Sequence, residues 1–217
     1  MGPCPSKAVD LYWLPLGAGT PVVAGAGRIY EAAVAARDRR PRSDLYHAAL
    51  QVHLDGRRWV IESAPVWDRP EADRGVVATG PVGMAWLGRW NLFRYEVRRW
   101  RDGVIPDLAA AVDSPRRVSA DRQTASRLLD CAPRFPAATW GRDEQHAGDM
   151  WNSNSLIAWL LTVSGHDVEA VAPPPCGRAP GWSSGVVVAR RGIESTVTRA
   201  HSKHDDRRVH GRAHNRR

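Results

Sequence analysis

The 217-residue sequence has few cysteines, only two phenylalanines and no long apolar run. Its three cysteines (Cys4, Cys131 and Cys176) are widely spaced and form no CxxC pair, which argues against a disulfide framework or a zinc ribbon. No apolar run approaches the roughly 20 residues of a membrane-spanning helix, and no secretory signal is apparent at the N-terminus. We therefore expect a cytoplasmic protein without a membrane span.

Tryptophan is the abundant aromatic residue, with ten copies that extend from Trp13 to Trp182. This spread predicts one folded domain over residues 1–191, which is within the size range of a single hydrophobic core. Residues 192–217 differ, because they contain seven basic residues, three acidic residues and almost no large apolar side chain. That composition predicts a disordered basic tail.

The net charge of +8 is shared equally between this tail and the rest of the chain, which carries 24 basic and 20 acidic groups. We therefore do not expect a nucleic-acid partner, except through the tail, which could bind a polyanion by charge alone. No glycine-rich phosphate motif or metal-ligand spacing is present, so no cofactor is expected; His47 and His53 lie too far apart along a strand to share a metal. The oligomeric state stays open.

The dipeptide Asp55-Gly56 is the clearest structural signal, because it favours a two-residue β-hairpin turn. We predict antiparallel strands over 46–54 and 58–63, with opposed residues whose numbers sum to 111. Further strands are expected over 11–16, 75–79, 92–99 and 185–191. Helices are expected over 28–39, over 120–131 with Ser119 as cap, and over 153–163 before Gly165. The predicted fold class is α+β, an antiparallel sheet packed against helices.

Three side chains are candidates for a catalytic site. His47 and Glu62 lie toward the open end of the hairpin, on the same face, where a carboxylate could orient an imidazole. Ser153 opens an apolar helix, where unpaired N–H groups and the helix dipole favour an anion. Simpler interpretations stay open for each: a half-buried strand histidine, a surface carboxylate, and an ordinary helix cap at Ser153 or Asn152.

The order of three motifs resembles the circularly permuted papain-like fold of permuted NlpC/P60, LRAT-like and YiiX-like proteins. The motifs are HAALQV (47–52), IESAP (61–65) and NSNSLIAWLL (152–161). In that fold a histidine begins a strand, a polar residue follows on the next strand, and the catalytic cysteine opens a later helix. The resemblance covers residues 44–165. The whole chain also resembles a family of actinobacterial proteins, which implies no activity.

Ser153 matches the position of the family's catalytic cysteine. The resemblance implies a hydrolase or acyltransferase acting on an amide or ester, with Ser153 as nucleophile, His47 as base and Glu62 orienting the imidazole. The backbone N–H of Ser153 and the side chain of Asn152 would stabilise the oxyanion. Because a hydroxyl is far less acidic than a thiol, the alternative is a catalytically inactive protein that binds a peptide, lipid or cell-wall fragment in its cleft.

Overall fold

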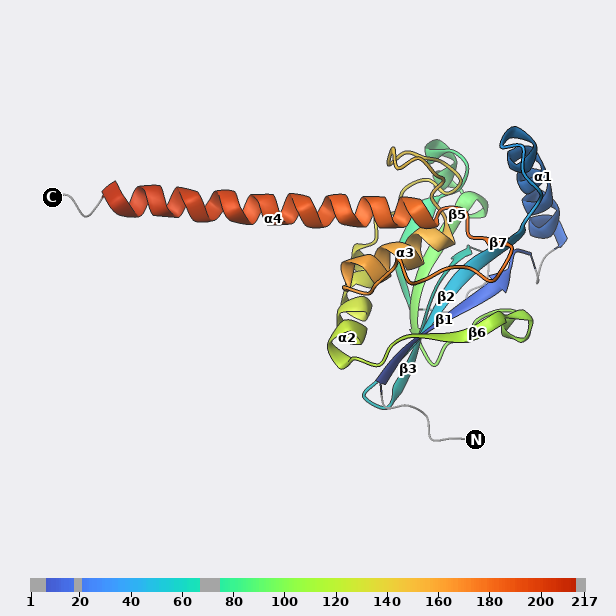
Figure 1. Cartoon of the computed structure of the whole chain (residues 1–217), viewed down its shortest axis with the longest axis horizontal. Helices are drawn as coiled ribbons and strands as arrows, with labels where there is room; N and C mark the ends of the chain where they lie inside the picture. The colour runs from blue at the N-terminus through green and yellow to red at the C-terminus, as the bar shows by residue number, and fades with distance from the viewer. Residues whose placement is uncertain (1–6, 18–20, 67–74, 214–217) are drawn as a thin grey trace.

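The computed structural model describes residues 7–17, 21–66 and 75–213 (Figure 1). Its strands are β1 (Lys7–Pro15), β2 (Asp44–Leu54), β3 (Arg57–Pro65), β4 (Val76–Pro81), β5 (Arg94–Arg101), β6 (Val112–Ser119) and β7 (Gly177–Arg178). Its α-helices are α1 (Pro21–Arg37), α2 (Arg122–Cys131), α3 (Ser153–Val163) and α4 (Trp182–Ala213). Short 3-10 helices are η1 (Ala85–Arg89), η2 (Asn91–Phe93), η3 (Leu108–Ala110) and η4 (Ala132–Arg134).

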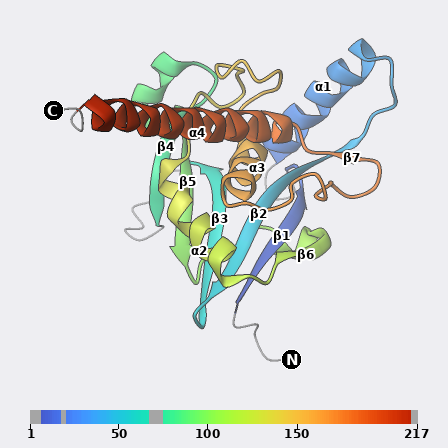
Figure 2. The ribbon, with the colours of Figure 1, turned by 60° about the vertical axis from the view of Figure 1, so that its left-hand side comes forward.

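The described strands form one sheet in the order β4-β5-β3-β2-β1-β6, in which all neighbours are antiparallel. The short strand β7 adds a parallel pair to the beginning of β2. Helices α2 and α3 pack on one face of this sheet, and α4 packs against α3 on the same side (Figure 2). The predicted α+β class, an antiparallel sheet packed against helices, is therefore confirmed.

The hairpin of β2 and β3 has the predicted turn and register. Asp55 and Gly56 both have positive φ, 51° and 72°, as the favoured two-residue turn requires. Leu50 pairs with Ile61 and Leu54 with Arg57, so the numbers of opposed residues sum to 111. A local turn signal was therefore sufficient to predict how these two strands pair.

The two faces of the sheet differ in the side chains that they carry. The helix-covered face is apolar, and its buried strand residues include Leu11, Trp13, Leu50, Val52 and Ile61. The opposite face has a smaller apolar cluster around Tyr12, Leu14, Ala49, Val60 and Ile105. It also carries titratable side chains and is named the charged face here; these side chains are Asp10, His47, Glu62, Glu96 and Arg98.

Helix α4 overturns the prediction of a strand over 185–191, while the disordered basic tail expected over 192–217 stays a prediction. An added Cβ at Gly185 would lie 2.3 Å from the carbonyl oxygen of Ser155, so this glycine permits the close approach of α4 to α3. Val186 and Ala189 are buried in the same contact, and this packing overrides the strand preference of the three valines. The helix then continues through exposed residues 192–198 to Ala213 (Figure 1), because extending a formed helix costs less than nucleating one.

One smaller prediction was also wrong, and one strand was not predicted. Helix α2 is capped by Asp121, whose carboxylate accepts a hydrogen bond from the Thr124 N–H at 2.7 Å. The hydroxyl of Ser119 instead accepts from the Asp121 N–H at 3.0 Å. Strand β6 lies in a segment for which no strand was predicted, and it pairs with β1 at the end of the sheet.

Candidate functional site

The beginning of α3 is held by its own polar residues. The Asn152 side-chain oxygen accepts hydrogen bonds from the N–H groups of Asn154 (2.9 Å) and Ser155 (3.3 Å). In return, the Asn152 N–H donates to the Ser155 hydroxyl at 3.0 Å, which completes a capping box. The Asn152 amide donates to the Pro180 carbonyl at 2.8 Å. Asn152 is therefore the helix cap, and its amide points to the backbone of the next loop rather than to an oxyanion site.

Ser153 is the first helical residue and is 5% exposed. Within the part of the chain that the structure describes, its hydroxyl makes no hydrogen bond. The hydroxyl is therefore not consumed as a cap. A nucleophilic role would require an imidazole within hydrogen-bond reach.

His47 does not supply that imidazole, because it projects from the opposite face of the sheet. The pairing of β1 with β2 runs without a break from Leu54 to Tyr46, so side chains alternate strictly along β2. Ala48 packs in the core beneath the helices and Ala49 packs in the cluster on the charged face. His47 has the parity of Ala49, so its ring faces away from α3.

Burial dominates the electrostatics of His47. It lowers the pKa of the imidazole to about 4, and the nearby carboxylate of Asp107 opposes the shift only partly. The ring is therefore neutral at neutral pH. Among the described residues it has no hydrogen-bond partner, and in particular it makes no bond to Ser153 or Glu62.

Glu62 shares the face of His47, as the hairpin register predicted, but it binds a different partner. Its carboxylate accepts a hydrogen bond from Arg98 at 3.3 Å, and Arg98 also donates to Glu96 at 3.0 Å. Burial raises the pKa of Glu62, and the Arg98 guanidinium pulls it back down in part. The predicted site of Ser153, His47 and Glu62 is therefore not assembled: two members share one face and the third lies on the other.

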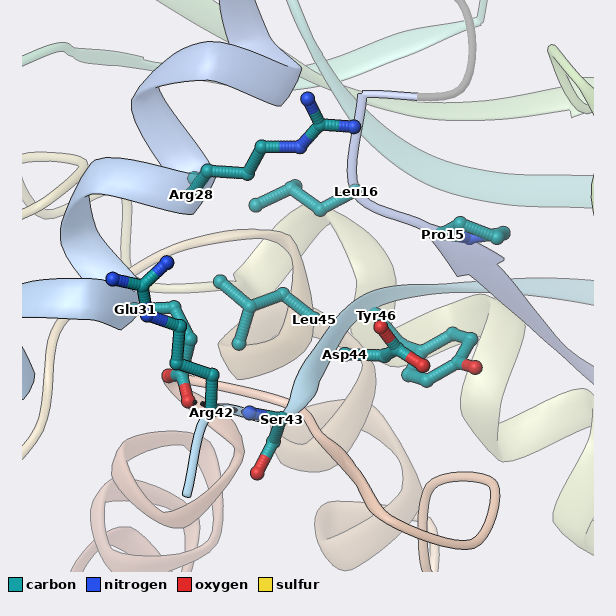
Figure 3. Close-up of a pocket in the computed structure, with 10 residues that line it drawn as sticks. Pro15, Leu16, Arg28, Glu31, Arg42, Ser43, Asp44, Leu45 and Tyr46 are labelled. Atoms are coloured by element: carbon teal, nitrogen blue, oxygen red, sulfur yellow. Dashed lines mark hydrogen bonds between the residues drawn. The ribbon is translucent and has the colours of Figure 1, made fainter. Parts of the chain in front are cut away.

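A cavity with a volume of about 560 Å³ lies beside this region. It lies between α1, the end of β1 and the beginning of β2 (Figure 3). The lining combines charged and apolar side chains: Pro15, Leu16, Gly27, Arg28, Glu31, Arg42, Ser43, Asp44, Leu45 and Tyr46. Sequence analysis missed this site, although the arginines of the segment DRRPRSD (38–44) are a signal for it.

Glu31 connects the elements that line this cavity through hydrogen bonds and an ion pair. Its buried carboxylate accepts hydrogen bonds from Arg40 (2.5 and 3.1 Å) and from the N–H of Ser43 (2.8 Å), and Arg178 lies 3.5 Å away. The hydrogen bond from Arg40 is the main reason that the pKa of Glu31 is lowered. These contacts fix helix α1 to the segment that leads into β2 and to β7. Arg40 and Arg178 also balance the negative charge of Glu31.

Arg28 and Arg42 remain available at the same cavity. Both are exposed, and neither guanidinium forms an ion pair or hydrogen bond with any residue that the structure describes. Figure 3 shows the apolar side chains of Leu16 and Leu45 between them. The cavity therefore offers two free cations around an apolar centre, with Asp44 as its remaining acidic group.

The described ranges hold no candidate metal site and no membrane-spanning helix. They contain no group of three or more histidine, cysteine, aspartate or glutamate side chains arranged to hold a metal ion. None of their helices combines the length and the apolar character needed to cross a bilayer.

Comparison of the chain with protein-family models, with curated proteins and with solved structures found no match. The papain-like resemblance therefore stays a prediction.

Proposed function

We propose that the protein binds a small ligand that combines an acidic group with an apolar part: a peptide, a lipid or a cell-wall fragment. The observation that carries this proposal is the cavity of about 560 Å³ with free guanidinium groups at Arg28 and Arg42. Its volume is within the range of ligand pockets. A guanidinium group binds a carboxylate or phosphate through two parallel hydrogen bonds, and the apolar side chains between the arginines would accept the remainder of the ligand.

We also propose that the chain has the circularly permuted papain-like fold. The order of the three motifs supports it, and so does the contact between the start of α3 and the strand of His47. In that contact the Asn154 amide donates to the Tyr46 carbonyl at 2.9 Å. The cavity is lined by Tyr46 as well, so a ligand there would lie beside the beginning of α3.

A serine hydrolase or acyltransferase is the second candidate, favoured by the free hydroxyl of Ser153 at the N-terminus of α3. We rank it lower because no base assists this hydroxyl: His47 projects from the other face and Glu62 is paired with Arg98. We expect no labelling by a fluorophosphonate probe. Labelling that disappears in Ser153→Ala would instead establish the catalytic candidate.

The binding proposal is tested with a dansyl-labelled undecanoic acid, which joins a carboxylate to an apolar chain. We expect saturable enhancement of dansyl fluorescence, and displacement by lauric acid, muramyl dipeptide or trialanine identifies the class of ligand. The double variant Arg28→Gln/Arg42→Gln should bind the probe at least about ten-fold more weakly, since a hydrogen bond to a charged group contributes about 1.5 kcal/mol or more.

Arg37→Gln is the matched control, because Arg37 lies on the same helix, is highly exposed and does not line the cavity. It should bind the probe like the parent protein. Equal binding by the double variant and the parent, or no binding by the parent of the probe and its competitors, would refute the proposal.

A further inference from the structure

The segment between β4 and β5 exposes an unusual amount of apolar surface. Five large side chains within ten residues are exposed, and they form what is named the tryptophan patch here: Leu92 (71%), Trp86 (57%), Met84 (45%), Trp90 (44%) and Phe93 (37%). The short helices η1 and η2 carry most of them. Exposed apolar patches of this kind mark surfaces that contact a partner or a membrane.

A cation lies inside the tryptophan patch. The guanidinium carbon of Arg89 is 3.9 Å from the ring centroid of Trp90 and 5.5 Å from that of Trp86. The two indole rings meet edge to face with centroids 5.9 Å apart. The sequence from Val82 to Tyr95 has no acidic residue and a second arginine at Arg94. The patch therefore combines aromatic rings with positive charge.

Hydrogen bonds hold the segment that carries the tryptophan patch in place. The N–H of Val82 donates to the Phe93 carbonyl at 2.8 Å, which closes the segment at its two ends. Arg142 donates to the Gly83 carbonyl at 2.6 Å and joins the segment to the loop over residues 141–150. The patch is thus held in place while its apolar side chains face solvent.

Two acidic residues on that neighbouring loop are already engaged. The carboxylate of Asp143 accepts from the N–H groups of Ala147 (2.7 Å) and Gly148 (2.9 Å). That of Glu144 accepts from the Thr139 N–H (3.0 Å) and hydroxyl (2.6 Å). Neutral backbone and hydroxyl donors therefore hold both carboxylates in the loop, and the bonds from Thr139 lower the pKa of Glu144, so that it stays charged.

Helix α4 leaves the body of the protein beside the same loop. Arg191 donates to the carbonyls of Gln145 (2.9 Å) and His146 (3.1 Å). Figures 1 and 2 both show the loop and the start of α4 on one side of the molecule. From Gly192 onward the sequence carries seven basic and three acidic residues. The start of α4 therefore lies beside the loop that is joined to the tryptophan patch.

We propose that the tryptophan patch docks the protein onto an anionic lipid bilayer. Tryptophan favours the interface between lipid headgroups and chains, and the positive charges of Arg89, Arg94 and α4 complement anionic headgroups. A protein partner fits less well, because a standard protein interface needs about 20–30 residues on each side, whereas this patch occupies residues 84–93.

Sedimentation of the full chain with vesicles tests the proposal. We expect binding to vesicles that mix phosphatidylcholine with phosphatidylglycerol, weaker binding to pure phosphatidylcholine, and a loss of affinity as salt is added. Leu92→Asp should reduce binding to the mixed vesicles by roughly ten-fold or more, since it places a charge at the most exposed position of the patch. Val104→Asp is the matched control, because Val104 is 67% exposed and lies outside the patch.

Near-ultraviolet circular dichroism establishes that both variants keep the parent fold. If folded Leu92→Asp sediments with mixed vesicles like the parent, α4 alone accounts for binding and the proposal is wrong. Equal binding of the parent to neutral and anionic vesicles would also overturn it. So would a parent dimer, seen by analytical ultracentrifugation, that Leu92→Asp converts to a monomer, because the patch would then bind a second copy of the chain.

Discussion

The buried side chains on the two faces of the sheet are stabilised by different interactions. On the helix-covered face, side chains such as Trp13, Leu50 and Ile61 leave water by packing against α2, α3 and α4. On the charged face, Glu62, Glu96 and Arg98 are each less than 9% exposed and depend on one another. Truncating an apolar side chain lowers the free energy of unfolding in proportion to the atoms removed. Removing one member of a buried ion network leaves a buried charge without its partner, which costs more.

The largest effect is expected at Arg98. Arg98→Met should lower the free energy of unfolding by about 3–5 kcal/mol, because it leaves the buried carboxylate of Glu62 without the cation that pairs with it. Arg99→Met is the control on the other face, since Arg99 donates to the neutral carbonyl of Leu129 at 2.9 Å; it should cost about 1 kcal/mol. Urea unfolding measures both, and equal losses would contradict the distinction between the faces.

The second effect is a pH dependence of stability that arises from His47 on the charged face. The folded-state pKa of His47 is about 4, below the ordinary value of 6.5, so the unfolded chain takes up its proton first as the pH falls. The stabilisation from His47 is therefore fully present above pH 6.5 and is lost between 6.5 and about 4. The loss should reach about 3 kcal/mol.

This loss is measured as the free energy of urea unfolding at a series of pH values. His47→Gln should remove that part of the pH dependence, while His146→Gln, in an exposed loop, should leave it unchanged. A His47→Gln profile that parallels the parent would show that the imidazole is not buried on this face.

Local signals predicted the pieces of the fold better than their packing. The Asp55-Gly56 turn fixed the hairpin register, and helix α3 extends over the predicted residues before Gly165, whose φ is +86°. The segment over 185–191 was misassigned because its valines favour a strand locally, while the close contact at Gly185 depends on α3, some thirty residues earlier.

The candidate site failed for a related reason. The register of the hairpin places His47 and Glu62 on one face, but no feature of the hairpin specifies which face α3 will cover. The partner of Glu62 comes from β5, whose pairing with β3 is not local in sequence. The cavity beside α1 depends in the same way on Glu31, which pairs with Arg178, a residue distant along the chain. Faces and partners are set by tertiary contacts, which periodicity and turn chemistry do not encode.

The smallest effect is expected at Ser153, in comparison with Ser155 on the same helix, α3. The Ser155 hydroxyl donates to the Gly181 carbonyl at 2.8 Å and accepts from the Asn152 N–H, so Ser155→Ala should cost about 1–2 kcal/mol. Ser153→Ala removes a hydroxyl without a partner among the described residues and should change the free energy of unfolding by less than about 0.5 kcal/mol.

Thermal or urea unfolding of the two variants, prepared side by side, separates these roles. A cost at Ser153 as large as that at Ser155 would mean that the Ser153 hydroxyl contributes to the fold. A near-zero cost would instead mean that Ser153 is free for a ligand or a reaction. Because the two serines lie two residues apart on one helix, differences in helix propensity cannot produce that contrast.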